Sequence, residues 1–402
     1  MGKVESRINS NGIASMDDPR VRAQMASKYP ARARELPDQV LMGQAVHNLR
    51  GLREGMKGLR KRTAPGSGGL RPEFLIVLGE KLEAYHMALL EDWGMRYLQG
   101  ELPPWFSVMW LSVETVPLYK SEEKEAVRLI GMRNPLAKLL HRMVVQENEA
   151  DLVAFFEPQQ IALSKGGASK LMHSVRLMME KEELRREQGV EAVEEIMVCK
   201  IDTTNAFNSD ARASVVEALV KEPSLQHLAC STACQLVPCY GLESRGEKWG
   251  EGAAGVTQGD PPASPQFCAS WHPPVRDLDA ALAPDGMAKF GRDDGFCVGY
   301  PSKLFPALLR FAKEVEEKFN IQLNISKCEV FTWTGQLPEG TPPGMKLAGV
   351  EVEGDWEDGC LVYGVPVGTD RYVAAMMDKK VNKIASKAAR ACQVLEGEAQ
   401  AM

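Results

Sequence analysis

The chain of 402 residues lacks several features that would assign it to a protein class at once. It has no run of about 20 apolar residues, so no membrane-spanning helix and no membrane partner are expected. No positively charged start followed by an apolar stretch indicates a secretory signal. The nine cysteines are scattered, and none forms a C-x-x-C pair, which disfavours a disulfide framework and a zinc ribbon. These absences predict an intracellular, reducing location, either nuclear or cytoplasmic.

An excess of positive charge is absent as well. The net charge of −6 disfavours a protein coated in nucleic acid. Two segments are nevertheless locally basic: residues 50–62 hold six Lys or Arg and one acid, and residues 379–390 hold five and none. Such segments suit the binding groove of a polymerase. Charge alone favours the plainer interpretation, which is two solvated helix faces.

Hydrophobic periodicity predicts an α+β fold. A polar stretch over residues 1–35 is expected to be a mobile lead-in. Strands are expected at 113–118, 127–130 and 196–201, and helices at 37–61, 72–98, 135–156, 166–186, from 302 onwards and at the C-terminal end.

Several side chains within these elements carry more specific expectations. The leucines of 72–98 are expected on one broad apolar face, Leu78 and Leu89 among them, and Leu309 on the apolar face of the helix from 302. Ser209 is expected to cap a helix that reaches about residue 221. Three cysteines have a spacing that suits one helix face, with buried thiols as the favoured interpretation: Cys230, Cys234 and Cys239.

Three carboxylates stand where expected strands end. Asp202 directly follows the apolar run 196–201, and Asp293 and Asp294 lie between two short apolar segments. Two ionised carboxylates about 4 Å apart repel each other by roughly 4 kcal/mol at an effective dielectric of 20. If the fold gathers these acids, they must bind a divalent cation or shift their pKa values. Two Mg²⁺ ions held in this way serve phosphoryl and nucleotidyl transfer, whereas each acid alone is more simply a turn or cap residue.

Two other segments can be interpreted either as ligand-binding segments or as ordinary surface structure. Residues 255–262 combine glycines and prolines in a tight loop whose N–H groups can approach a phosphate or a base pair closely. Residues 323–328 place Lys327 where it can reach an anionic substrate. Taken alone, the first is an ordinary loop and the second a surface lysine.

The order and spacing of these motifs resemble the reverse transcriptases of non-LTR (LINE-type) retrotransposons. The resemblance covers about residues 50–390. Its motifs stand here as Asp202 with 206–208, the Gln-Gly-Asp-Pro loop at 258–261, the acid pair at 293–294, the Leu-Asn-x-x-Lys-Cys segment at 323–328 and the Gly-Val-Pro-x-Gly segment at 364–368, which is expected to be a tight turn. Upstream, residues 63–70, Lys120, Arg128 and residues 157–167 match further segments of that family.

The resemblance implies a right-hand polymerase fold of the α+β class, with helical fingers, an antiparallel-sheet palm and a truncated thumb. It implies an enzyme, an RNA-directed DNA polymerase, that takes an RNA template, a DNA primer and deoxynucleoside triphosphates. No endonuclease domain is expected in this chain. The parts would follow one another as a mobile N-terminal lead-in (1–49), fingers (50–190), a palm with the catalytic motifs (191–345), and the palm–thumb junction with the start of the thumb (346–402).

The resemblance also assigns roles to individual residues. Asp202, Asp293 and Asp294 would be catalytic and would hold two Mg²⁺ ions, with Mn²⁺ as a substitute. The backbone carbonyl of Thr203 would be a further metal ligand. For the substrates, Phe207 would close the sugar pocket against a 2′-hydroxyl, Gln258 and Gly259 would line the template–nucleotide pocket, Lys120 and Arg128 would clamp phosphates, and Lys327 would approach the triphosphate.

The acid pair departs from the family pattern, which has an aromatic residue two positions before the first Asp and a small or apolar residue just before it. Here these positions hold Gly291 and Arg292. An Arg about 7 Å from a divalent ion would repel it by roughly 5 kcal/mol at a dielectric of 20. Strand alternation predicts that Arg292 faces away from Asp293 and lies on the side of Asp294.

This departure keeps a second function open, a catalytically inactive, diverged remnant that still binds nucleic acid. A third alternative, an RNA-directed RNA polymerase, is disfavoured by Phe207.

Overall fold

The computed structural model describes residues 12–31, 47–120, 125–189 and 194–400. The chain forms two compact units, each built from segments that are not contiguous in sequence. The first unit combines residues 1–155 with 205–270, and the second combines 156–204 with 271–402. The chain passes from one unit to the other at residues 155–156, 204–205 and 270–271, and the last of these positions lies inside helix α13, Ala263–Leu282. The four consecutive parts expected from the resemblance therefore remain a prediction, because compactness groups the chain differently.

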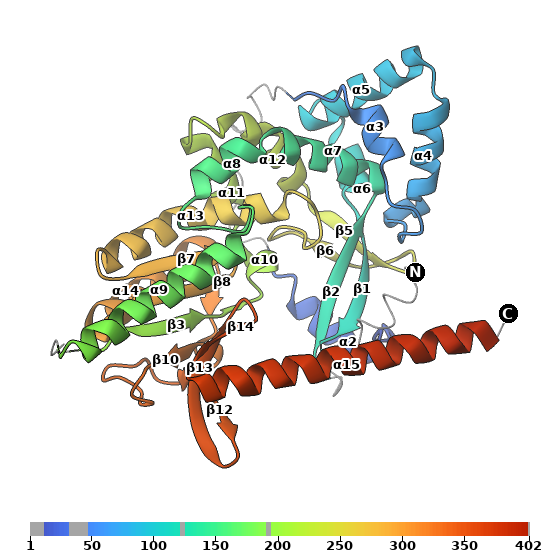
Figure 1. Cartoon of the computed structure of the whole chain (residues 1–402). Coiled ribbons are helices and arrows are strands. Elements are labelled where there is room, and N and C mark those ends of the chain that lie inside the picture. Colours follow the sequence, from blue (N-terminus) through green and yellow to red (C-terminus); the bar gives the residue numbers. More distant parts are fainter. Residues whose placement is uncertain (1–11, 32–46, 121–124, 190–193, 401–402) are drawn as a thin grey trace. The chain divides into compact units, whose positions relative to one another are not determined.

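The sheet of the first unit has the strand order β2-β1-β5-β6. Strands β1 (Val113–Tyr119) and β2 (Val127–Arg133) pair along their whole length as an antiparallel hairpin (Figure 1). Alternate residues of both strands are buried, which is the pattern of a half-buried strand. Strand β5 (Tyr240–Ser244) is parallel to β1, and β6 (Glu247–Gly252) is antiparallel to β5. The strands predicted at 113–118 and 127–130 are thus confirmed.

Helices make up the rest of the first unit. Two stretches expected as single helices are each divided in two, at residues 82–83 and at Asn148. The helices are α2 (Pro19–Ser27), α3 (Leu52–Lys57), α4 (Pro72–Lys81), α5 (Ala84–Leu98), α6 (Pro104–Trp110), α7 (Pro135–Glu147), α8 (Glu149–Phe156), α10 (Ala206–Ser209), α11 (Arg212–Lys221) and α12 (Ala229–Leu236), with 3₁₀ turns at Ser67–Gly69 and Gln226–Leu228.

Three side-chain expectations in this unit are wrong. Leu78 and Leu89 are 41% and 51% exposed, because the extended backbone at Leu82 ends α4 and breaks the single apolar face. Ser209 is the last residue of α10, and the residue that precedes α11 is Ala211. Cys239 is exposed, since α12 ends before it, whereas the other two cysteines of that group are buried.

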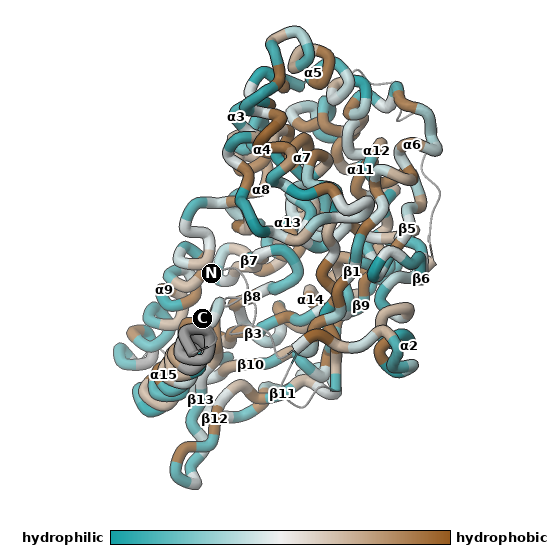
Figure 2. The backbone as a smooth tube through the Cα atoms, turned by 90° about the vertical axis from the view of Figure 1, so that its right-hand side faces the viewer, coloured by the Kyte–Doolittle hydropathy of each residue, from teal (hydrophilic) through white to brown (hydrophobic). Residues whose placement is uncertain are grey.

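Part of the expected N-terminal lead-in is folded. Within residues 12–31, Asp18 caps α2 by accepting a hydrogen bond from the Arg20 backbone N–H, at 2.8 Å. Val21 and Met25 are buried in a cluster that includes Val127 of β2. Figure 2 shows hydrophilic residues of this helix in teal. The expectation of a mobile segment is therefore wrong for residues 12–31. Of the helix expected at 37–61, residues 32–46 lie outside the described residues, and α3 covers only 52–57.

The central sheet of the second unit has the strand order β11-β10-β3-β8-β7. Strand β3 is antiparallel to both of its neighbours, β8 and β10, and β7 and β8 form an antiparallel hairpin. A short pair, β4 with β9, continues from the end of β3. The strand predicted at 196–201 is confirmed. The strands are β3 (Met197–Ile201), β4 (Thr203–Thr204), β7 (Met287–Gly291), β8 (Asp294–Gly299), β9 (Gln322–Leu323), β10 (Glu329–Phe331) and β11 (Lys346–Leu347).

The two faces of this sheet are both covered. On one face, Val198, Phe296 and Val298 pack in a cluster that includes Val175 of α9 (Gly167–Glu187). On the other face, the Phe290 ring lies 5.5 Å from that of Phe311 on α14 (Pro301–Phe319). Leu309 on α14 is 53% exposed, so its expected place on the apolar face is wrong.

A second sheet follows near the C-terminus, with the order β12-β13-β14. Its strands are β12 (Gly349–Val352), β13 (Asp355–Val362) and β14 (Val365–Gly368), and the single long helix α15 (Asp370–Gln400) comes next (Figure 1). The segment 364–368, expected as a tight turn, is mostly strand β14, and the turn itself is at residues 363–364. The α+β class is confirmed. No helix in the described parts of the chain is long and apolar enough to cross a membrane.

Candidate active site

The second unit brings the three predicted acids to one end of its central sheet. Ile201, the last residue of β3, pairs with Gly295 of β8, so the next residues at this end are Asp202 and Asp294. Asp293 lies in the turn that joins β7 to β8. Asp202 and Asp294, which are 92 positions apart in the chain (294 − 202), are therefore neighbours because β3 ends where its antiparallel partner β8 begins.

These carboxylates lie close enough together for their charges to shift pKa values within the group. Partial burial is the main reason why the pKa values of Asp293 and Asp294 are raised. Repulsion adds to the effect, since Asp294 acts on Asp293 and Asp202 acts on both. Positive charge opposes it: Arg292 lowers both pKa values, and Lys200 lowers that of Asp294. On balance, the pKa values of both acids stay above the usual value.

The donor chemistry of this acidic end fits Mg²⁺. Carboxylate oxygens are the ligands that this hard cation prefers, and a divalent charge would relieve the repulsion that raises the two pKa values. Across the described residues, no group of three or more His, Cys, Asp or Glu side chains is gathered closely enough to hold a metal ion as it stands. The fit thus rests on the donor type and the charge, and on the common location of the three acids.

The β7–β8 turn consists of two residues, Arg292 and Asp293, because Gly291 pairs with Asp294. Arg292 adopts a left-handed backbone with φ of +74°, which is unfavourable for a residue other than glycine. Strand alternation ends at Gly291, so it does not determine the direction of the Arg292 side chain in the turn. The positive charge of Arg292 acts on both acids of the pair.

The backbone around Asp202 is held by the segment that precedes β10. The Asn324 N–H donates to the Asp202 carbonyl oxygen at 2.9 Å, and Thr203 pairs with Leu323. Lys327 is exposed, and its Nζ atom lies 4.0 Å from Oδ2 of Asp202. Lys327 thus lies near the first of the three acids, and its contact with a triphosphate stays a prediction. Sequence reasoning missed that the Asp202 N–H donates to Sγ of Cys328 at 3.5 Å, although the Leu-Asn-x-x-Lys-Cys segment was the available signal.

The first unit places Phe207 beside the Gln-Gly-Asp-Pro loop. The half-buried Phe207 ring stacks on Phe267, with 4.7 Å between the ring centroids and 14° between the ring planes. The Val256 N–H donates to the carbonyl oxygen of Phe207 at 2.6 Å. A side chain at Gly255 would overlap the backbone of α10, so this close approach requires glycine. Phe207 therefore lies beside the segment that leads into the loop, and its role at the sugar of a nucleotide stays a prediction.

Within this loop, exposed and buried residues have different tasks. Gln258 and Gly259 are exposed at the tip, and Gly259 has φ of +100°. Asp260 is buried and forms an ion pair with Nε of Arg133 at 2.6 Å. Its other oxygen lies 3.1 Å from Nδ1 of His141. Burial alone would raise the pKa of Asp260, but His141 and Arg133 hold it below the usual value.

This buried network was missed by the sequence analysis. Arg133 also donates to the Leu111 carbonyl at 2.7 Å, and Tyr97 contacts His141 at 2.9 Å. Arg133 and His141 thus hold both oxygens of Asp260, so Asp260 anchors the loop and leaves Gln258 at its tip. The residues lie far apart in sequence, and the only local signal was the Asp of the Gln-Gly-Asp-Pro motif.

Lys120 and Arg128 share the exposed face of the β1–β2 hairpin. Arg128 pairs with Leu118, and the Lys120 N–H donates to the Ala126 carbonyl at 2.8 Å, so the two basic residues are near neighbours on one face. The opposite face carries the buried residues of both strands. Two cations on one side of a hairpin suit contact with phosphates, and the phosphate clamp stays a prediction.

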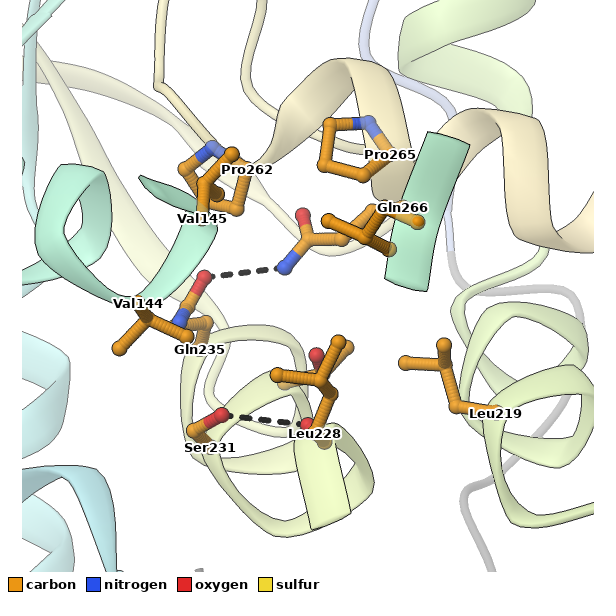
Figure 3. Close-up of a pocket in the computed structure, with 11 residues that line it drawn as sticks. Val144, Val145, Leu219, Leu228, Ser231, Gln235, Pro262, Pro265 and Gln266 are labelled. Carbon is orange, nitrogen blue, oxygen red and sulfur yellow. Dashed lines mark hydrogen bonds between the residues drawn. The ribbon is translucent and has the colours of Figure 1, made fainter. Parts of the chain in front are cut away.

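A cavity of about 30 Å³ lies elsewhere in the first unit, between α7, α11, α12 and the start of α13. Figure 3 shows Gln235 and Gln266 pointing toward each other across it, joined by a 2.9 Å hydrogen bond. Its other lining residues are mostly apolar, such as Val144 and Leu219. A cavity of this size has room for only about two water molecules, so it is not a substrate pocket.

Thr203 and Lys327 thus accompany the acids in the second unit, and the other predicted substrate residues belong to the first. No protein-family model matches this sequence, and no curated protein matches it either.

Proposed function

We propose that this chain is an RNA-directed DNA polymerase of the non-LTR retrotransposon type, with a right-hand arrangement of fingers, palm and thumb. The observation that carries the proposal is the common location of Asp202, Asp293 and Asp294 at one end of a β-sheet, with the pKa values of the last two raised by burial and repulsion. Backbone strain, as at Arg292, and carboxylates with raised pKa values both occur preferentially at functional sites.

The proposed reaction is the attack of a primer 3′-hydroxyl on the α-phosphate of a deoxynucleoside triphosphate, with release of pyrophosphate. When bound, Mg²⁺ would supply positive charge at the attacking oxygen and at the triphosphate. Asp202, Asp293 and Asp294 would hold the metal, with the Thr203 carbonyl as a further oxygen donor. Lys327, close to Asp202, would contact the triphosphate.

The first unit would supply the contacts to template and nucleotide. Phe207 is held rigid by its stacking on Phe267, which suits a side chain that excludes a 2′-hydroxyl by contact. Gln258 and Gly259, exposed on a loop anchored by Asp260, would face the template–nucleotide pair. Lys120 and Arg128 would bind phosphates, and the Arg can do so with two parallel hydrogen bonds.

Primer extension on an RNA template tests the proposal. Wild-type protein with Mg²⁺ or Mn²⁺ should incorporate deoxynucleotides, and Asp202→Asn should reduce incorporation by about 10³-fold or more. Asp277→Asn, which changes an exposed acid on α13 in the same unit, is the matched control and should retain wild-type activity. Equal activity of wild type and Asp202→Asn would refute the proposal. A strong preference for ribonucleotides would instead point to an RNA-directed RNA polymerase.

A second candidate, an inactive remnant that binds nucleic acid, is favoured by one observation. Arg292 places a permanent positive charge beside both Asp293 and Asp294. Under this alternative, wild type binds a primer–template without extending it, and Arg292→Ala creates activity. Wild-type extension at millimolar Mg²⁺ eliminates it.

A further inference from the structure

Tyr363 occupies the place where a side chain at position 291 would lie. A Cβ atom added to Gly291 would overlap the Tyr363 hydroxyl oxygen and the adjoining ring carbon. The aromatic ring at this spot therefore comes from a different element, the turn between β13 and β14.

The contacts of Tyr363 follow the face of the β7–β8 hairpin that carries Asp294. Gly291 and Asp294 are paired across the hairpin, so their side-chain directions share one face. The Tyr363 hydroxyl donates to the Asp294 carbonyl oxygen at 3.5 Å. Its ring lies 5.8 Å from that of Phe296, two residues further along the same face. Tyr363 thus contacts both strands next to the acidic turn.

The backbone at Tyr363 is strained. Val362 pairs with Val365, so the β13–β14 turn has two residues, with φ of +48° at Tyr363 and +76° at Gly364. Asn, Asp or Gly is favoured at the first position of such a turn, and a bulky aromatic residue is strained there. The turn that it contacts also has a strained non-glycine residue, Arg292. Two strained turns that meet through one side chain suggest that the contact itself has a function.

We infer that Tyr363 is a positioning residue for the acid pair, an inference that rests on the proposed function. From the β13–β14 turn, it fills the space left open by Gly291 and holds the Arg292–Asp293 turn in the conformation that presents both carboxylates. Metal binding at the Arg292–Asp293 turn therefore requires that the β13–β14 hairpin packs against it.

A double-mutant cycle between positions 291 and 363 tests this inference. Gly291→Ala inserts a methyl group that displaces Tyr363, and Tyr363→Ala removes the ring. Each change should lower kcat for deoxynucleotide incorporation by about 100-fold, because a displacement of the acids by about 1 Å suffices for this loss. The double variant should be no worse than Tyr363→Ala, since both single changes break the same contact. Fully additive losses would overturn the inference.

Two readouts separate positioning from general stability. The Mg²⁺ concentration for half-maximal activity should rise about tenfold in Tyr363→Ala, while the KM for primer–template stays unchanged. The exchanged pair Gly291→Tyr with Tyr363→Gly should regain at least about tenfold activity over Tyr363→Gly, since the ring then returns from the other side. The control Trp356→Ala truncates an exposed aromatic residue of β13 and should behave as wild type.

Hydrogen exchange gives a measurement that needs no activity. The amides of residues 292–295 should exchange about tenfold faster in Tyr363→Ala than in wild type or in Trp356→Ala. If wild type incorporates nucleotides and Tyr363→Ala matches it in kcat, metal dependence and exchange, only the inference has failed. If wild type shows no incorporation with Mg²⁺ or Mn²⁺, the proposed function has failed.

Discussion

Two groups of carboxylates, one in each unit, experience opposite electrostatic environments. Asp260 of the first unit is almost fully buried, yet its pKa is lowered, because Arg133 and His141 contact both of its oxygens. Asp293 of the second unit is half-buried and Asp294 is exposed, yet the pKa values of both are raised. The comparison teaches that the direction of the pKa shift depends on ion pairing with a cationic side chain, and not on depth of burial. An acid with such a partner has a structural role, whereas an acid with a raised pKa is a candidate to bind a ligand. The comparison also predicts that the two groups will respond in opposite ways to mutation.

The largest expected effect is the loss of catalysis in Asp293→Asn. Amide replacement removes a metal ligand, so the rate of deoxynucleotide incorporation should fall by about 10³-fold or more, equivalent to about 4 kcal/mol. The fold should remain intact, because within the described part of the chain Asp293 forms no buried ion pair of the kind that Asp260 makes with Arg133. Primer extension together with the thermal midpoint checks both parts. An inactive variant that is also unfolded would contradict the contrast with Asp260.

The next effect is a loss of stability in Asp260→Ala. This change leaves the buried guanidinium of Arg133 without its counter-charge, at a cost of about 3 kcal/mol or more in the free energy of unfolding. Denaturant titration measures it. The matched control is Asp92→Ala, which breaks an exposed ion pair with Arg96 and should cost about 0.3 kcal/mol. Similar losses in the two variants would show that the Asp260 network does not anchor the loop.

A smaller effect concerns pH and the metal-free protein. Since the folded-state pKa of Asp293 is raised, its contribution to stability is present below the unfolded pKa of about 4 and is lost as the pH rises through the folded value. Asp293→Asn should therefore raise the thermal midpoint of metal-free protein at pH 7 and leave it nearly unchanged at pH 4. Addition of Mg²⁺ should stabilise wild type more than the variant. A lower midpoint of the variant at pH 7 would contradict the direction of the pKa shift.

The smallest expected effect belongs to Arg292→Ala. Because the Arg292 charge partly neutralises the acid pair and competes with a cation, its removal should lower the Mg²⁺ concentration for half-maximal activity by about threefold. Titration of Mg²⁺ at low ionic strength is the measurement, and Lys303→Ala, a distant exposed cation of the same unit, is the control. An unchanged metal requirement would mean that solvent already screens this charge.

Much of the secondary structure followed from local patterns. The alternation of residues 113–118 and the apolar run 196–201 were sufficient for strands β1 and β3, because burial on one or both faces leaves a direct trace in the sequence. Helix breaks were not predictable in the same way. The division at residues 82–83 depends on an extended backbone at Leu82 and not on a proline or glycine, so Leu78 and Leu89 were assigned to a face that does not exist.

The candidate site likewise has features that local sequence predicts and features that depend on tertiary contacts. The sequence by itself determined which residue types could form an oxygen-donor site and in which order their motifs occur. Both are properties of the residues and their spacing and need no tertiary contact. Only the tertiary structure decided that Asp202 and Asp294 end adjacent strands, that Asp260 is neutralised by Arg133, and that Tyr363 fills the space beside Gly291. Each of these depends on strand register and on contacts between residues remote in the chain, and such contacts are set by packing of the whole unit and leave no mark at either position.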